Sequence, residues 1–188
     1  MSKFTCLLVV VLLFAAPLAC SYGAGKAPPP PKGPKVGDKI TDFELKNLEG
    51  TSVKTEDARK DKVLVLVFGT TWGPPCEKQV PELLKVQKEY GDKVVVVGVY
   101  VKDTADKVKA YNEKLTVTYP TLMDSDGAIG LEYGARRFPT VIVADKDGKI
   151  TYRGGSTDFA KLKKAIDALL PTPPAEQPKE QPKDKPND

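Results

Sequence analysis

The chain has 188 residues, with 29 lysines and arginines, 25 aspartates and glutamates, and no histidine. This length suits one domain with short appendages, and the lack of histidine excludes a Ser-His-Asp triad, a histidine-ligated zinc site and a Cys-x-x-Cys-His haem site. Nucleic-acid binding would need basic side chains gathered on one face, and a formal net charge of only +4 does not indicate such a face.

The N-terminus has the pattern of a targeting segment. Lys3 precedes an apolar run, residues 6–16, which is too short to span a bilayer comfortably and is typical of a secretory signal. The run leads to Leu18-Ala19-Cys20-Ser21, which resembles a bacterial lipoprotein signal, where the cysteine is lipidated. We therefore predict a signal peptide over residues 1–19, lipidation of Cys20, and an exported protein anchored in the bacterial cell envelope, facing the periplasm or exterior. Cleavage after Ser21 and plain secretion is the alternative.

The cysteine count limits the redox chemistry. Cys6 is lost with the signal, and Cys20 is either lipidated or lost as well, which leaves Cys76 as the one free thiol. A domain with one thiol forms no internal disulfide, so any redox chemistry is intermolecular or oxidises the thiol itself.

Proline content divides the chain into a tether, a domain and a tail. Residues 20–35 include Pro28 to Pro31 and predict an extended spacer, whereas residues 171–188 hold six prolines among polar residues and predict a disordered Pro/Lys/Glu-rich tail. The folded domain is predicted over residues 36–170.

Strand and helix patterns alternate within that domain. Nearly continuous apolar runs predict strands buried on both faces of a sheet, and amphipathic segments predict the helices between them. In chain order, we expect a hairpin of 43–46 and 51–53, a strand at 63–68, a helix at 75–90, a strand at 94–101, a helix at 104–115, a strand near 121–123, a short helix at 128–133, a hairpin of 141–143 and 150–152, and a last helix from 159 to 170. The pattern is α/β, with parallel strands at its centre.

Residues 63–81, VLVLVFGTTWGPPCEKQVP, resemble the active-site strand, turn and helix of the thioredoxin superfamily. The segment is most similar to exported, membrane-tethered TlpA-type thiol-disulfide oxidoreductases of the redoxin (AhpC/TSA-related) group, and further matching motifs cover residues 36–170. The resemblance implies a thioredoxin fold: a central mixed β-sheet flanked by helices, with a redoxin-type N-terminal β-hairpin and a central insertion. It also implies that Pro81 kinks the helix and that Pro139 is a cis-proline beside the active site.

The chain departs from this family at the active site. The family motif is Trp-Cys-Pro-Pro-Cys, in which the first cysteine is the nucleophile and the second resolves the mixed disulfide. Here Gly73 occupies the first position and only Cys76 is kept. Val67 stands where many thioredoxins have a buried carboxylate that helps to deprotonate the second cysteine. The resemblance therefore implies a degenerate Gly-Pro-Pro-Cys site without normal dithiol turnover.

Three interpretations of Cys76 remain open on sequence alone. It is a small, partly buried hydrophobic residue; or a working single thiol, uncovered because Gly73 has no Cβ and activated by the helix start; or the thiol of a one-cysteine peroxidase related to peroxiredoxins. The third interpretation would use Arg136 or Arg137 to polarise a peroxide, but surface charge is the simpler role for these arginines.

The same resemblance suggests a partner-binding edge. Its candidate residues are Trp72, Pro75, Phe138, Pro139 and Thr140, although Trp72 would also suit packing against the 73–76 turn. The expected partners are exported proteins that carry thiols or disulfides, with the membrane reached through the lipid anchor. We expect no cofactor and no metal. The main alternative to a thiol-disulfide protein is a non-catalytic peptide-binding module with the same fold.

Overall fold

Seven strands form one mixed sheet in the computed structural model, which describes residues 32–170. The sheet order is β2-β1-β5-β4-β3-β6-β7, and β3, β4 and β5 run parallel while the other neighbours pair antiparallel. The elements are β1 (Glu44–Asn47), β2 (Ser52–Lys54), α1 (Thr55–Arg59), β3 (Val63–Gly69), α2 (Pro74–Tyr90), the 3-10 turn η1 (Gly91–Lys93), β4 (Val94–Val101), α3 (Ala105–Leu115), β5 (Thr121–Asp124), α4 (Ala128–Glu132), β6 (Thr140–Ala144), β7 (Ile150–Gly154) and α5 (Phe159–Asp167).

Strand β3 lies at the centre of the sheet and is buried along its whole length. Because successive side chains of a strand point to opposite faces, Leu66 and Phe68 pack into the apolar cluster on one side, and Val65 and Val67 pack into the cluster on the other. This two-sided burial explains the unbroken apolar run in the sequence.

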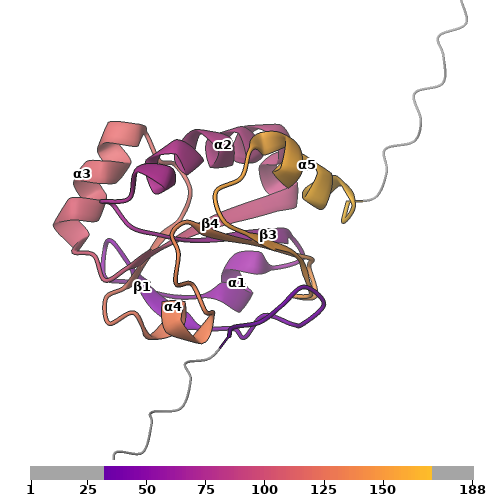
Figure 1. Cartoon of the computed structure of the whole chain (residues 1–188), viewed down its shortest axis with the longest axis horizontal. Coiled ribbons are helices and arrows are strands. Elements are labelled where there is room, and N and C mark those ends of the chain that lie inside the picture. The colour runs from indigo at the N-terminus through magenta and orange to yellow at the C-terminus, as the bar shows by residue number, and fades with distance from the viewer. Residues whose placement is uncertain (1–31, 171–188) are drawn as a thin grey trace, which may run out of the picture.

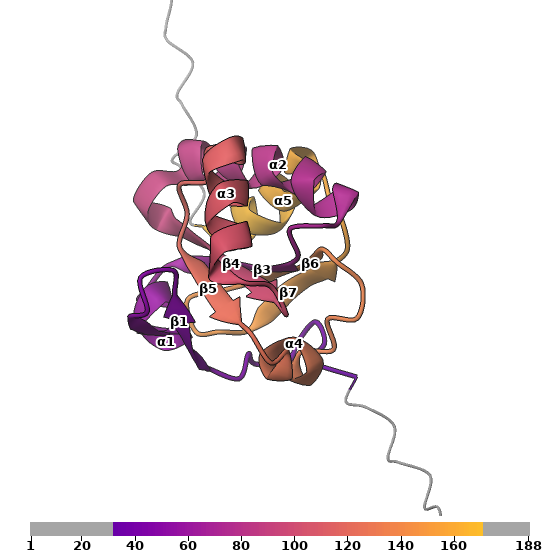
Figure 2. The same cartoon turned by 90° about the vertical axis from the view of Figure 1, so that its left-hand side faces the viewer.

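Helices cover both faces of the sheet. Figures 1 and 2 show α2, α3 and α5 on one face and α1 and α4 on the other. The described chain enters on the α4 side and ends at α5, on the opposite side. Within residues 32–170, no helix combines the length and the apolar character needed to cross a membrane.

The observed elements confirm the predicted order of strands and helices. Strands β1 and β2 form the expected hairpin. The sequence analysis missed α1 and η1, because each is too short to show a helical period. In α1 the start is set by a tertiary contact, since the buried Thr55 hydroxyl accepts a hydrogen bond from the Phe43 amide at 3.0 Å. The predicted signal peptide, Cys20 and the predicted tail lie outside the described residues.

A buried amide connects α2 to the loop before α5. The Gln79 side chain donates to the Thr157 carbonyl at 3.0 Å and accepts from the Thr157 amide at 2.8 Å, with both residues buried. The pairing satisfies two backbone groups that water cannot reach. It therefore fixes the second turn of α2, one turn after Cys76.

Replacing Gln79 by methionine is expected to destabilise the protein by about 1–3 kcal/mol, because the Thr157 amide and carbonyl are left buried without partners. Urea unfolding measures this change as a lower midpoint at an unchanged slope. Lys78→Met, at an exposed position of the same helix, is the matched control. Its free energy of unfolding should stay within about 0.5 kcal/mol of the wild-type value. Equal midpoints for the two variants would contradict the assigned role of Gln79.

Candidate active site at the start of α2

The candidate site lies where the chain leaves β3 and enters α2. Gly73 precedes the helix with φ −90° and ψ 112°, and Pro74 begins it, a position where the missing proline N–H costs nothing. The Cys76 amide donates to the Gly73 carbonyl at 2.8 Å. Cys76 therefore sits in the first turn of a 17-residue helix, as the sequence predicted, and Pro81 lies inside that helix.

Cys76 is a free cysteine with only 6% of its surface exposed. The interpretation that the missing Cβ of Gly73 uncovers this thiol is therefore wrong. Gly73 is itself buried, and the atoms nearest to the position of a side chain there belong to Thr70 and Cys76.

The space at residue 73 remains compatible with a side chain. A Cβ built on Gly73 would lie 3.4 Å from the Cys76 sulfur, 4.0 Å from the Cys76 Cβ and 3.2 Å from the Thr70 hydroxyl oxygen. The Cβ–Cβ separation falls within the range of about 3.5–4.5 Å seen across disulfides. The Cβ–Cβ separation would therefore suit a disulfide between residues 73 and 76.

Burial raises the pKa of the Cys76 thiol above its ordinary value. The backbone amide and hydroxyl of Thr70 act in the opposite direction and lower this pKa, while the negative charge of Asp103 raises it further. Desolvation is the largest of these effects, so the thiol is mainly protonated at neutral pH.

A buried carboxylate holds the turn that carries the site. Asp103 follows β4 and accepts hydrogen bonds from the Thr71 amide at 2.8 Å and from the Thr71 hydroxyl at 3.0 Å. Because β3 and β4 pair in parallel, with Gly69 opposite Tyr100, their carboxyl ends meet and bring Asp103 to this turn. Asp103 therefore fixes the chain between Gly69 and Gly73.

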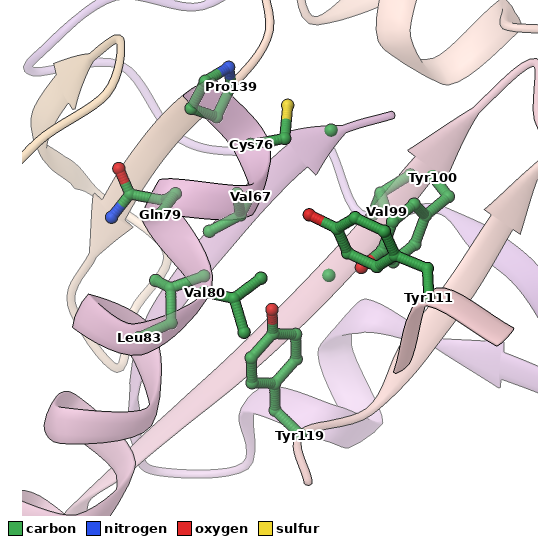
Figure 3. A pocket seen from close by; sticks show the side chains of 12 residues that line it. Val67, Cys76, Gln79, Val80, Leu83, Val99, Tyr100, Tyr111, Tyr119 and Pro139 are labelled. Atoms are coloured by element: carbon green, nitrogen blue, oxygen red, sulfur yellow. The ribbon is translucent and has the colours of Figure 1, made fainter. Parts of the chain in front are cut away.

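A small cavity of about 20 Å³, enough for one water molecule, lies behind Cys76. Figure 3 shows Cys76 and Pro139 at one end and the hydroxyl groups of Tyr100, Tyr111 and Tyr119 gathered towards the other. Desolvation raises the pKa of all three tyrosines, so they stay neutral. Val67 also lines the cavity, so a buried apolar side chain faces Cys76 here.

The predicted partner-binding residues divide into exposed and buried ones. Trp72 is 72% exposed and Pro75 is exposed, whereas Pro139 and Thr140 are buried and Phe138 is half-buried. The Phe138-Pro139 peptide bond is cis, as expected. The exposure of Trp72 contradicts the alternative of simple packing against the 73–76 turn.

The arginines considered for a peroxidase lie just before the cis-proline loop. The side chains of Arg136 and Arg137 are exposed, and the Arg137 carbonyl accepts from the Thr140 hydroxyl at 2.8 Å. This placement gives no support for peroxide activation at the sulfur.

Sequence reasoning missed Thr70, Asp103 and the three tyrosines. The parallel pairing of β3 and β4 was a usable signal for Asp103, because residues that follow neighbouring parallel strands meet at one edge. Tyr111 and Tyr119 reach the cavity from α3 and from the loop before β5, so only the tertiary structure reveals them.

Comparison with known proteins supports the family resemblance. The Redoxin family model matches residues 35–168. The chain is 36% identical over 121 residues to the thioredoxin-like protein YneN of Bacillus subtilis, covering 63% of this chain and 70% of YneN. It is 31% identical over 117 residues to the thiol-disulfide oxidoreductase ResA of Bacillus thuringiensis, covering 62% and 67%. A DsbF homologue from Corynebacterium diphtheriae superposes with a TM-score of 0.65 at 27% identity, covering 73% of this chain and 91% of that one. The domain therefore has the predicted α/β thioredoxin fold.

Substituting Gly73 by cysteine is expected to create a disulfide with Cys76, since the Cβ positions suit the bond and the backbone φ of −90° suits any L-residue. After mild oxidation, mass spectrometry of the variant should show the loss of two hydrogens. The loss should map to the peptide that contains residues 73 and 76, as an internal disulfide. Gly73→Ser is the control for the added side chain. Two thiols that stay free in the folded variant would show that the turn no longer supports two-cysteine chemistry.

Proposed function

Because the chain belongs to the Redoxin family, we propose that it is an exported, membrane-tethered thioredoxin-like protein that acts on protein thiols and disulfides through Cys76 alone. The observation that carries the proposal is the helix start itself: Gly73 replaces the first motif cysteine, while Cys76 and the surrounding turn are retained. The name of ResA, a thiol-disulfide oxidoreductase, places thiol-disulfide chemistry among its relatives.

The proposed reaction stops at a mixed disulfide. The Cys76 thiolate attacks one sulfur of a partner disulfide, so the partner S–S bond breaks and a Cys76–S bond forms. The other partner sulfur leaves with the electron pair and takes a proton from water. A second thiol, from the partner or from a low-molecular-weight thiol, must then attack this bond to release Cys76.

The exposed indole and the cis-proline loop provide the partner surface. Trp72 offers a large apolar face beside the turn, and Pro139, which precedes β6, lines the same cavity as Cys76. An extended peptide lying along this loop would place its sulfur near Cys76. Binding would also displace the turn that covers the thiol, which links recognition to reactivity.

Two observations favour a second candidate, a peptide-binding module without chemistry. Cys76 is buried while Trp72 is exposed, so the surface offered to a partner is aromatic rather than nucleophilic. Burial and a raised thiol pKa both disfavour the one-cysteine peroxidase, because peroxide reacts with the thiolate.

The test is to incubate the purified protein with a peptide disulfide whose leaving thiol absorbs light. We expect one equivalent of leaving thiol per chain and a mixed disulfide on Cys76, without further turnover. Cys76→Ser, which is nearly isosteric, should release none. Release without Cys76, or peptide binding without any release, would contradict the thiol chemistry, and the second outcome would establish the binding module.

Catalytic turnover is tested separately, by measuring the rate of insulin reduction. The wild type should not exceed the rate of the reductant alone, whereas Gly73→Cys should gain activity because the strand, turn and helix are already in place. Clear turnover by the wild type would contradict a degenerate site.

The proposal that the protein is exported and anchored is based on the N-terminal sequence, in which Cys20 is the predicted site of lipidation. Cys20→Ala should move the protein from the membrane fraction to the soluble envelope fraction, because the acyl anchor is lost. Mass spectrometry of the wild-type N-terminus should show an acylated Cys20. A mature protein that begins at Tyr22 without acyl mass would mean plain secretion instead.

A further inference from the structure

We propose that Thr70 is a positioning residue for Cys76: its hydroxyl donates a hydrogen bond to the Cys76 sulfur when that sulfur carries negative charge. This inference rests on the proposed function only in taking the charged sulfur to be the reacting species. Thr70 is a neutral residue, and no basic side chain lines the cavity beside Cys76.

The Thr70 hydroxyl is buried and unpaired. Thr70 is 1% exposed, and its Oγ1 makes no hydrogen bond with any residue that the structure describes. A buried hydroxyl without a partner costs roughly as much free energy as a lost hydrogen bond. The hydroxyl would recover this free energy in another state of the site in which it gains a partner.

The candidate for that partner is the Cys76 sulfur. The Thr70 hydroxyl oxygen and the Cys76 sulfur lie 3.2 Å and 3.4 Å from one point, the position of a Cβ on Gly73. Both the hydroxyl and the backbone amide of Thr70 act on the sulfur in the direction that favours its charged form. Thr70 therefore presents two donors to one atom, at the end of β3 where Asp103 fixes the next residue.

Tyr111 is the competing donor. It is 7% exposed, its hydroxyl also lacks a partner among the described residues, and Figure 3 shows that hydroxyl pointing into the cavity behind Cys76. The cavity separates it from the sulfur, however, so Tyr111 reaches Cys76 only through a bound molecule such as water. Direct donation from Thr70 should consequently have the larger effect.

The other groups facing the sulfur do not supply this stabilisation. Asp103, in the loop after β4, carries negative charge and opposes ionisation of Cys76. Tyr100 on β4 and Tyr119 before β5 line the cavity as neutral hydroxyls, and the Tyr100 hydroxyl donates to the Asn112 side chain at 3.2 Å. Pro139 has no donor. Thr70 is thus the residue whose side chain acts in favour of the thiolate.

The test is the titration of Cys76 in the folded full chain, followed by the Cβ chemical shift of ¹³C-labelled cysteine and assigned with Cys76→Ser. This readout requires no reagent to reach the buried thiol. Thr70→Val, which removes the hydroxyl and keeps the side-chain shape, should raise the midpoint by about one pH unit, a tenfold loss of thiolate at neutral pH. Thr70→Ser, which keeps the hydroxyl, should titrate close to the wild type.

Two further variants make the result specific. Thr157, in the loop before α5, has another buried hydroxyl without a partner among the described residues. Its backbone is bonded to the Gln79 side chain, one turn along α2 from Cys76, so Thr157→Val should leave the titration of Cys76 unchanged. Tyr111→Phe should shift the midpoint less than Thr70→Val. A Thr70→Val midpoint equal to that of the wild type, or a larger shift from Tyr111→Phe, would overturn the proposal. Failure to form mixed disulfides would contradict the proposed function and leave this titration interpretable.

Discussion

The pair of hydrogen bonds between Asp103 and Thr71 holds the site together. It joins the end of β4 to the turn after β3, and it does so with a carboxylate that is itself buried. Hydrogen bonds to an ionised group contribute about 1.5–3 kcal/mol each, more than neutral pairs. With the turn fixed at Thr71, the chain must cross Gly73 into α2 at one angle, and this angle places Cys76 beneath Thr70 and Pro139.

The same carboxylate works against the thiol that it positions. Its charge disfavours a thiolate, and burial disfavours it further. The helix start opposes these effects, but a dipole at a helix terminus contributes only about 0.3–1 kcal/mol, less than one pKa unit. The structure thus favours a stable turn over a reactive sulfur. Reactivity then depends on local donors and on a partner that opens the turn, rather than on a thiol that is ionised in advance.

Sequence patterns were sufficient for the fold because the strands are buried on both faces and the helices are amphipathic. The run from Val63 to Phe68 permits few alternatives, and the motif around Cys76 locates the helix start. The exposure of individual side chains was not predictable in this way. Whether Gly73 uncovers Cys76 depends on residues far along the chain such as Pro139, which lines the same cavity as Cys76, and Trp72 is exposed because nothing in the described chain packs over it.

With Gly73 at the position of the attacking cysteine, both the formation and the resolution of a mixed disulfide are affected. In a two-cysteine site the second thiol lies within bonding distance of the mixed disulfide, so resolution is intramolecular and fast. At position 73 the backbone still leaves a Cβ 4.0 Å from that of Cys76, yet no sulfur is present to use this proximity. In the proposed reaction, release of a bound partner therefore needs a thiol from the partner or from solution. Cys76 is buried among Gly69, Thr70 and Pro139, and the same burial that slows its attack also shields the mixed disulfide from such thiols. A site of this kind is suited to holding a partner rather than turning it over.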